Sequence, residues 1–338
     1  MRRAPAAVAS ALVVLSTLTG CGEGTGPGGD VAAPARLAIG SNPAGTHVYA
    51  VAAGLAKVLQ DEGGMRTTIR PFSGSSVYLP LLQRGELPLG LNVSIDSYLA
   101  YAGLPPYEMR MDKLRLLAMM FPLPIMYMVR ADSDIRRVED LRGRRVVITF
   151  RANASLDQLH RGILATGGLT ADDVQSVVVA GLPEAMDMLA QGRADAVPTG
   201  LNTALALQVN STLPGGIRYI TMGADEGRLA ETMPGSEPVT IMPGVVGIKE
   251  PTRVAGIVDF LNTGSDLPEQ LAYDIVRTIY ENWSTLRDDL VQMEDLEVEA
   301  MAPARIVHPY HPGAIRFYRE VGLWTEEHER NQQRLLPQ

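Results

Sequence analysis

The fold class is decided by the stretch that begins RLAIG at residues 36–40, continues as SNPAGT at 41–46 and runs on as VYAVAAGLAKVLQ at 48–60. The first segment is short and apolar and ends at a glycine, so it predicts a buried strand. The last segment is apolar, with small residues on its packing face, which predicts a buried helix. A strand, a polar loop and a helix in this order form the basic unit of an α/β fold.

The same unit recurs along the chain. Strands are expected over 67–71 and 87–93, with a glycine-containing loop and a helix between them. After Arg130 the pattern starts again, with a strand over 146–150 and a helix over 156–166. We therefore expect an α/β protein with mostly parallel sheets flanked by helices.

Composition excludes several classes of protein. The chain has 338 residues, of which 46% are hydrophobic and 20% are charged, and this excludes an intrinsically disordered chain. The 38 acidic residues outnumber the 30 basic ones, for a net charge of −8, which argues against a protein that binds nucleic acid by neutralising phosphates. A single cysteine leaves no internal disulfide and no zinc site built from cysteines.

Residues 1–20 are predicted to be a lipoprotein signal peptide. A basic start, MRR, precedes an apolar run over 4–18 that is shorter than the roughly 20 residues of a spanning helix. The run ends LTGC at 18–21, which resembles the bacterial lipobox, so cleavage before Cys21 and lipidation of its thiol are expected. The alternative is an ordinary signal peptide that happens to precede a cysteine. Cleavage would remove two arginines and change the net charge from −8 to −10.

A tether is expected over 21–35, between the lipidated cysteine and the folded body. Its sequence GEGTGPGGD at 22–30 has five glycines and a proline, a composition typical of a flexible linker. We therefore expect a periplasmic or otherwise extracytoplasmic protein that is anchored to a membrane by its lipid.

Motifs in a fixed order along the chain carry a family resemblance. They include VEDLRG at 138–143, GRADA at 192–196 and HPYHPGAIRFYRE at 308–320. Over residues 36–325 the sequence resembles the TAXI-family solute receptors of TRAP transporters. That resemblance implies a two-domain periplasmic binding-protein fold of type II-like topology, with a cleft between the domains.

The resemblance also implies a division into domains and a function. The first domain would be discontinuous, over 36–129 plus 240–320, the second would cover 130–239, and residues 321–338 would form a C-terminal tail. The protein would be a receptor that captures a small organic anion, of the amino acid, dicarboxylate or 2-oxo acid class, by hinge closure. It would deliver this ligand to a TRAP-type membrane permease, with no cofactor, no catalysis and no nucleic-acid partner.

Two alternatives stay open. The same fold could serve an ATP-driven importer or a sensor protein, which the genes beside this one would indicate. It could also carry an exported enzyme that acts on thiamine or pyrimidine precursors. An enzyme would need a nucleophile or a reactive histidine in the cleft, and His47 and His160 have no serine or cysteine partner visible in the sequence.

A ligand site is expected where loops follow the carboxyl ends of strands, because helix N-termini there present free N–H groups to a carboxylate. Serines and threonines in these loops could instead only cap the helices. The candidate ligand-binding residues are Gly45, Thr46, Tyr49, Ser73, Gly74, Ser75, Ser76, Asn92, Ser94, Asp96, Arg151, Asn153, Ala154, Ser155, Thr199 and Asn202.

Specific roles are expected for four residues, Arg151, Asp96, His308 and His311. Arg151 directly follows a strand, so we expect it to grip a ligand carboxylate; the alternative is a surface arginine. Asp96 could instead select an ammonium group, which would favour an amino acid over a simple dicarboxylate. His308 and His311 have the spacing of metal ligands, but each precedes a proline, so we expect a structural role and no metal.

Overall fold

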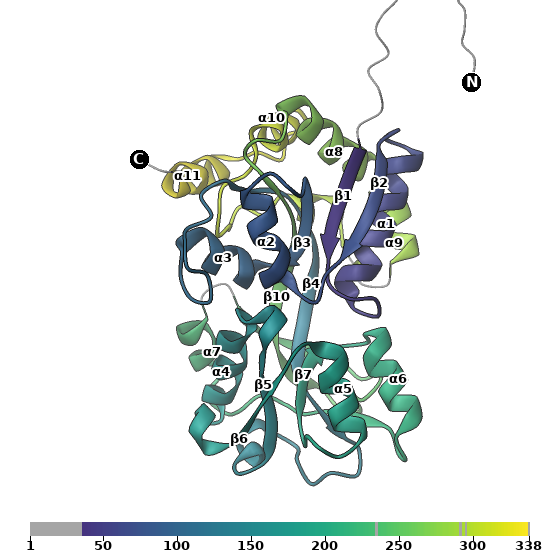
Figure 1. The fold of residues 1–338 in the computed structure, drawn as a ribbon, viewed down its shortest axis with the longest axis vertical. Helices are drawn as coiled ribbons and strands as arrows, with labels where there is room; N and C mark the ends of the chain where they lie inside the picture. The colour runs from purple at the N-terminus through teal and green to yellow at the C-terminus, as the bar shows by residue number, and fades with distance from the viewer. Residues whose placement is uncertain (1–35, 234–235, 291–292, 295, 337–338) are drawn as a thin grey trace, which may run out of the picture. The chain divides into compact units, whose positions relative to one another are not determined.

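The computed structural model describes residues 36–233, 236–290, 293–294 and 296–336 (Figure 1). The chain divides into two units, Met1–Ala33 and Pro34–Gln338, and all described residues belong to the second. The predicted signal peptide, Cys21 and the tether over 21–35 lie outside the described residues. Among the residues described, no helix combines the length and the apolar character needed to cross a membrane.

Two β-sheets form the framework of the body. Their strands are, in chain order, β1 (Arg36–Ser41), β2 (Arg66–Pro71), β3 (Leu89–Val93), β4 (Leu114–Arg130), β5 (Arg145–Phe150), β6 (Gln175–Val179), β7 (Val197–Gly200), β8 (Ile217–Tyr219), β9 (Glu237–Ile241) and β10 (Thr252–Gly264). The larger sheet has the order β2-β1-β3-β10-β4-β7, with β8 beside β4 and β9 beside β10. The smaller sheet pairs β5 with β6.

The α/β class with flanking helices is confirmed, and the strand pairings refine it. β1 pairs in parallel with β2 and β3, and β5 with β6, as the strand–loop–helix repeats predict. The pairings made by β4 and β10 are antiparallel, which the expectation of mostly parallel sheets did not include. These two strands are long, 17 and 13 residues, and run side by side in opposite directions.

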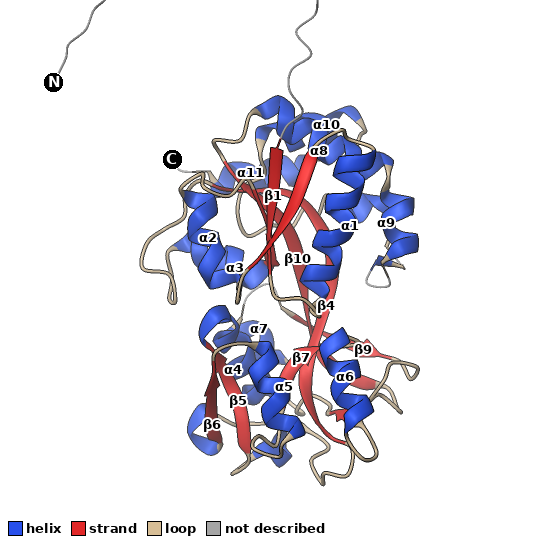
Figure 2. Ribbon diagram, turned by 45° about the vertical axis from the view of Figure 1, so that its right-hand side comes forward, coloured by secondary structure: helices blue, strands red, loops and turns tan. Residues whose placement is uncertain are grey.

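Helices gather in two groups around the strands (Figure 2). The first group contains α1 (His47–Asp61), α2 (Ser75–Gln83), α3 (Ser94–Ala102), α8 (Glu269–Glu281), α9 (Trp283–Asp289), α10 (Pro312–Glu320) and α11 (Glu326–Leu335). The second group contains α4 (Leu156–Thr166), α5 (Leu182–Ala190), α6 (Ala204–Thr212) and α7 (Gly227–Thr232). Short 3₁₀ turns lie at η1 (Val138–Leu141), η2 (Arg151–Asn153), η3 (Ala171–Asp173) and η5 (Val298–Met301).

β4 explains how one body supports both helix groups. Its sequence LRLLAMMFPLPIMYMVR is almost continuously apolar, and most of its side chains are buried. A strand covered on both faces reads as such a run rather than as an alternating pattern. In Figure 2, β4 and β10 run from the first helix group towards the second. These two strands therefore connect the two helix groups.

Candidate functional site

A cavity lies where the N-terminal ends of helices from both groups face one another. Its lining includes Thr46 and His47 at the start of α1, Asp96 in α3, and Leu156 and His160 in α4. The cavity encloses about 730 Å³ of empty space, part of it open to solvent. Because that figure includes open solvent, the enclosed space is smaller, and the case for a ligand site rests on the polar groups of the lining.

Three buried polar atoms in the lining have no hydrogen-bond partner among the described residues. They are Oδ1 of Asn42, Nε2 of His47 and Oγ1 of Thr199. Asn42 and His47 lie near the first helix group, and Thr199 lies in β7 beside the second. Buried polar side-chain atoms are nearly always hydrogen-bonded in proteins. These three atoms are therefore available to the polar groups of a molecule in the cavity.

The two histidines of the lining are neutral at neutral pH. Burial lowers the pKa of His160 to about 4, although its bond to the carbonyl of Ile148, at 2.6 Å, acts in the opposite direction. Because a carbonyl only accepts, Nδ1 of His160 carries the proton and Nε2 keeps a free lone pair. Burial likewise lowers the pKa of His47, against the effect of the Asn202 main chain. Both rings can therefore accept a hydrogen bond from a ligand.

Asp96 is the acidic group of the lining. Its carboxyl is fully buried and accepts hydrogen bonds from the hydroxyls of Ser75, at 2.6 Å, and Tyr107, at 3.2 Å. Burial raises the pKa of Asp96 to about 7, while the two hydroxyls oppose the rise. Neighbouring Asp259 in β10 is also fully buried, and neither of its carboxyl oxygens has a partner in the described part of the chain. Burial raises the pKa of Asp259 well above its usual range, and Asp96 adds to this effect.

The described lining contains no lysine or arginine. Arg151, the expected partner of a ligand carboxylate, is exposed and lies outside the lining. It begins η2 immediately after β5, and the preceding residue, Phe150, is the one that lines the cavity. Arg151 is therefore a surface arginine, which is the alternative given for it above. An anion in this cavity would have to be held by N–H groups and hydroxyls.

Five of the predicted ligand residues do line the cavity: Thr46, Ser73, Asp96, Asn153 and Thr199. Thr46 also caps α1, since its Oγ1 accepts a hydrogen bond from the Tyr49 N–H at 3.2 Å. Thr46 therefore both caps the helix and lines the cavity, so a capping role does not exclude contact with a ligand.

Four further candidates, Gly74, Ser75, Ser76 and Ala154, lie outside the lining, where the start of α2 contacts η2 and the residue after it. Nδ2 of Asn153 donates to Oγ of Ser75 at 2.9 Å, and the Ala154 N–H donates to Oγ of Ser76 at 3.2 Å. Gly74 lies against the same segment, where an added Cβ would be 2.1 Å from the carbonyl oxygen of Ala152. These contacts join the start of α2 to η2 and so connect the first helix group with the second.

The remaining candidates lie elsewhere. Nδ2 of Asn92 donates to Oγ of Ser97 at 2.8 Å in the core, and Ser94 is the buried first residue of α3. Gly45 has a φ of +88° and its carbonyl accepts the Leu205 N–H of α6. Outside the lining, besides Arg151, are Gly45, Tyr49, Gly74, Ser75, Ser76, Asn92, Ser94, Ala154, Ser155 and Asn202.

His308 and His311 have the structural roles expected for them. Nε2 of His308 lies 2.7 Å from Oδ1 of Asn262, inside the core. His311 caps α10, because its Nδ1 accepts the Gly313 N–H at 3.1 Å, and its Nε2 lies 3.0 Å from the carbonyl of Leu267.

Several polar residues of the site, among them Asn42, His47, His160 and Tyr107, were not predicted as ligand contacts from the sequence. His47 and His160 were considered only as catalytic groups, and Tyr107 was not considered. Histidines at helix N-termini beside strand ends carry a signal that could have been used. Tyr107 has none, because it follows Pro105 and Pro106 in an irregular loop.

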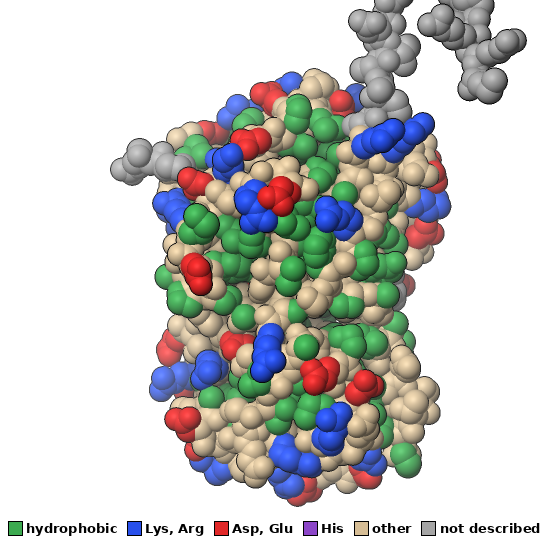
Figure 3. Space-filling view, in the orientation of Figure 1, with side chains coloured by type: hydrophobic (Ala, Val, Ile, Leu, Met, Phe, Trp, Pro, Cys, Tyr) green, Lys and Arg blue, Asp and Glu red, His purple; other side chains and the backbone are tan. Residues whose placement is uncertain are grey.

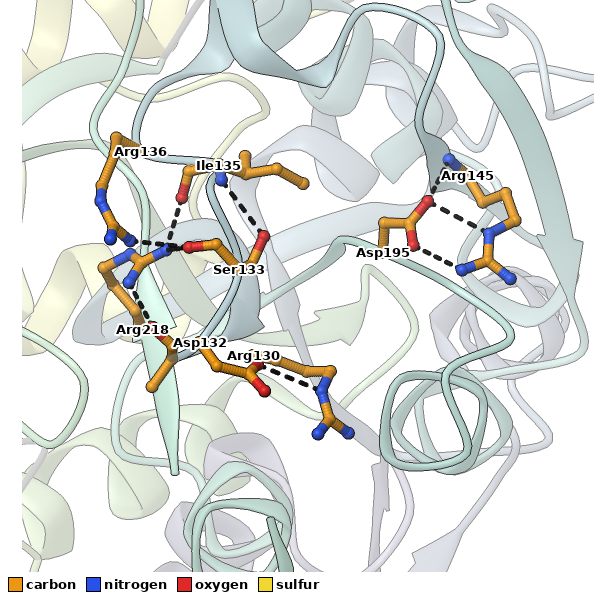
Figure 4. A network of polar contacts seen from close by, with 9 residues as sticks. Arg130, Asp132, Ser133, Ile135, Arg136, Arg145, Asp195 and Arg218 are labelled. Atoms are coloured by element: carbon orange, nitrogen blue, oxygen red, sulfur yellow. Dashed lines mark hydrogen bonds and ion pairs between the residues drawn. The ribbon is translucent and has the colours of Figure 1, made fainter. Parts of the chain in front are cut away.

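Arginines away from the cavity are engaged in structural contacts (Figure 4). The Arg145 N–H and Nε both donate to Oδ2 of Asp195, at 2.8 and 3.1 Å, so the GRADA motif holds β5 in place. Arg218 donates to the carbonyls of Ser133 and Ile135, each at 2.7 Å. Figure 3 shows side chains of both charges interspersed over one face of the body. The abundance of arginine in the chain therefore supports the fold and not the cavity.

The α/β body, with a helix group on either side of the cavity, has the arrangement expected of a two-domain periplasmic binding-protein fold. The chain belongs to the NMT1-like family, whose model matches residues 39–322.

Several solved structures match the chain at low sequence identity. The alkanesulfonate-binding protein SsuA from Xanthomonas axonopodis pv. citri, bound to MOPS, is 19% identical with a TM-score of 0.48, over 90% of this chain and 95% of that one. The periplasmic aliphatic sulphonate binding protein SsuA from Escherichia coli is 16% identical with a TM-score of 0.45, over the same shares. The BvgS periplasmic domain of B. pertussis is 16% identical with a TM-score of 0.49, over 86% of this chain and 46% of that one.

Proposed function

We propose that the protein is an extracytoplasmic receptor that captures a small organic molecule in the cavity and delivers it to a membrane permease. The observation that carries the proposal is the convergence of unpartnered polar atoms from Asn42, His47 and Thr199 on one cavity. A binding protein needs such atoms to orient its ligand, and leaving them unpaired costs about 1–3 kcal/mol each. The proposal includes no cofactor and no catalytic step.

The mechanism we propose is closure of two domains, 36–129 plus 240–320 and 130–239. Under this division Asn42 and His47 belong to the first domain and Thr199 to the second. A ligand that contacts all three would bind the closed state more tightly than the open one, and this difference in affinity would drive closure.

The ligand class that we propose is a small organic acid with an amino group, which narrows the expected range to amino acids. α1 has 15 residues, and the N–H groups of its first turn can hold a carboxylate. Asp96 offers a carboxylate to an ammonium group. Dicarboxylates and 2-oxo acids would leave Asp96 without a cation. A dicarboxylate would also need a partner for its second carboxylate, and the described lining has no lysine or arginine.

The partner that we propose is a TRAP-type permease, on the strength of the motif resemblance to TAXI-family receptors. A lipid on Cys21 would hold the receptor at the membrane. An ATP-driven importer or a sensor would use the same cavity, and the genes that neighbour this one would distinguish them. The lining histidines His47 and His160 have no hydrogen bond to a serine or cysteine among the described residues, so we do not propose the exported enzyme.

A thermal-shift and calorimetric screen tests the receptor function. The protein, with Cys21→Ser to stop lipidation, is screened against amino acids, 2-oxo acids, dicarboxylates and short sulfonates. A ligand at 100 times its Kd should raise the free energy of unfolding by about 2.7 kcal/mol. Thr199→Val, which keeps the shape and removes the hydroxyl, should weaken the best ligand. The proposal fails if no small molecule in the screen stabilises the folded protein.

A further inference from the structure

A chain of hydrogen bonds runs from the cavity to the contact between the helix groups. The Tyr107 hydroxyl donates to Oδ1 of Asp96 at 3.2 Å, and the Ser75 hydroxyl donates to Oδ2 at 2.6 Å. Nδ2 of Asn153 then donates to Oγ of Ser75 at 2.9 Å. All four side chains are at least nine-tenths buried. Asp96 belongs to the first helix group and Asn153 to η2, and Ser75 bonds both of them. Asp96 and Asn153 also line the cavity.

The direction of these bonds depends on the charge of Asp96. Ser75 has a single hydroxyl proton, and an ionised carboxylate can only accept. The proton of Ser75 therefore points at Asp96, and its lone pairs are left for Asn153. A charged acceptor polarises such a chain and strengthens the next bond along it. The Ala154 N–H, bonded to Oγ of Ser76, holds the same two segments together one residue further on.

No cation compensates the buried carboxylate within the described part of the site. The titratable groups that face Asp96 or share its cavity are neutral or acidic, namely Tyr78 of α2, Tyr107, Asp259 of β10, His47 of α1 and His160 of α4. Ionisation of Asp96 therefore opposes the enclosed arrangement unless the ligand supplies positive charge.

We propose that Asp96 couples ligand capture to domain closure, with Tyr107 and Ser75 as the positioning residues that hold its carboxyl between the cavity and Asn153. This inference rests on the proposed function, because closure is the motion that it regulates. A ligand ammonium at Asp96 keeps the carboxylate charged inside the closed cavity and so strengthens the bond of Ser75 to Asn153. Without such a ligand, closure requires that Asp96 take up a proton.

The sign of the pH effect follows from burial. In this structure burial raises the pKa of Asp96 to about 7, against a usual value of 3.8 in water. We expect opening of the cavity to admit water to Asp96 and lower its pKa, so that the closed state binds the proton more tightly than the open state. The advantage of the closed state is complete below the lower pKa and is lost as pH rises through about 7. Between the two pKa values the closed-to-open ratio falls about tenfold for each pH unit. His47 and His160 act in the opposite sense below their usual pKa, so the wild type must be compared with Asp96→Asn.

Closure can be followed without any ligand by fluorescence energy transfer. Labels are placed at Lys57→Cys in α1 and Val178→Cys in β6, both exposed, in the full chain with Cys21→Ser. The only variable is pH, from 5.5 to 8.5. The wild type should lose closed population with rising pH relative to Asp96→Asn. Tyr107→Phe should move the curve to higher pH, because the lost hydroxyl stabilised the carboxylate.

Tyr101→Phe is the matched control for Tyr107→Phe. It removes another buried tyrosine hydroxyl, one that donates to the carbonyl of Leu335 at 2.6 Å, and it should leave the pH curve unchanged. The coupling is overturned if Asp96→Asn and the wild type have the same pH profile, or if the two tyrosine variants behave alike. If that happens while a ligand still stabilises the protein in the screen, the receptor function stands. If the pH profile is as expected but no ligand is found, the receptor function is the part that fails.

Discussion

Gly74 is a residue at which the two helix groups are in close contact. Its φ of 173° is extended backbone that any residue can adopt, so glycine is needed here for space and not for conformation. An added Cβ would lie 2.1 Å from the Ala152 carbonyl oxygen and 2.3 Å from Oδ1 of Asn153. Neither neighbour can move without separating α2 from η2.

Gly74→Ala should therefore weaken ligand binding while the protein stays folded. We expect a loss of affinity of tenfold or more, because the closed state is forced apart while the open state is untouched. Titration calorimetry with the best ligand of the screen measures it. Gly181→Ala is the control, since Gly181 is also extended, with a φ of −169°, and its Cβ would make only ordinary contacts, with the Ser73 carbonyl oxygen at 3.5 Å and Cδ of Pro183 at 3.9 Å. Equal affinities for the two variants would contradict the prediction.

His160 should make the fold sensitive to acid. Its pKa is lowered to about 4 from a usual value of 6.5, so the folded state binds fewer protons than the unfolded state. The contribution to stability is therefore complete above pH 6.5 and is lost as pH falls towards 4. Between pH 7.5 and 5 the wild type should lose about 2 kcal/mol of unfolding free energy more than His160→Gln does. Denaturant unfolding at both pH values measures this, and equal losses would refute it.

Residue by residue, the sequence predicts five of the residues that line the cavity and several that lie outside its lining. Thr46, Asp96 and Thr199 could be found because polar residues that follow strands face the edge where helices begin. Arg151 could not be excluded, because the direction of a side chain in the first turn after a strand is not visible in a pattern. Tyr107 could not be found at all, since its position depends on the path of an irregular loop.

At the scale of elements, α11 is the helix that the sequence assigned to a tail. Gln332 ties it to the body, because its Oε1 accepts the Tyr310 N–H at 2.9 Å and its Nε2 donates to the Tyr310 carbonyl at 3.2 Å. His328 adds a contact with the carbonyl of Ala302 at 2.8 Å. The helix therefore satisfies backbone groups that would otherwise be buried and unpaired.

Gln332→Ala should lower the free energy of unfolding by about 1–3 kcal/mol, since it leaves two backbone groups of Tyr310 without partners. The neighbouring Gln333 is exposed and bonds only Glu329 of the same helix, so Gln333→Ala should change stability by less than about 0.5 kcal/mol. Thermal and denaturant unfolding of the two variants provide the comparison. A similar loss in both would mean that α11 is not held by Gln332.

Elements with a clear local signal were predicted well, and those without one were not. α4 was expected over 156–166 and is found there, because its apolar positions recur at helical spacing. β4 was not expected as one strand, since Pro122 and Pro124 interrupt its apolar run. α3 was missed because it begins at the residue after β3, which leaves no loop to separate the two elements.

At the scale of the whole molecule, closure should be visible in hydrogen exchange. The Ala154 N–H bonds Ser76 across the two segments, so it is protected only while they are together. A saturating ligand should slow its exchange in proportion to the closed population that is gained. The Gly313 N–H, which bonds Nδ1 of His311 within the cap of α10 and outside the cavity lining, should keep its rate. Parallel slowing of both would indicate general stabilisation instead of closure.

Of the whole architecture, the sequence predicts the strand–loop–helix units and their parallel strand pairings, and not the antiparallel pairings. The strand–loop–helix units repeat at short range, and their parallel pairings follow from that repetition. β10 pairs with β4 and β3 from more than a hundred residues away, and no local pattern specifies such a partner. The antiparallel centre of the larger sheet therefore depends on tertiary packing and could not be derived from the sequence.

The cavity lining without lysine or arginine has a consequence for the speed of capture. With no fixed positive charge in the site and an acidic body around it, no long-range field draws an anion towards the opening. A zwitterion has no net charge for such a field to act on, so it would arrive by diffusion alone at a rate that changes little with ionic strength. The receptor should therefore load its ligand equally fast in dilute and in salty surroundings, and differences in retention should depend on the rate of reopening.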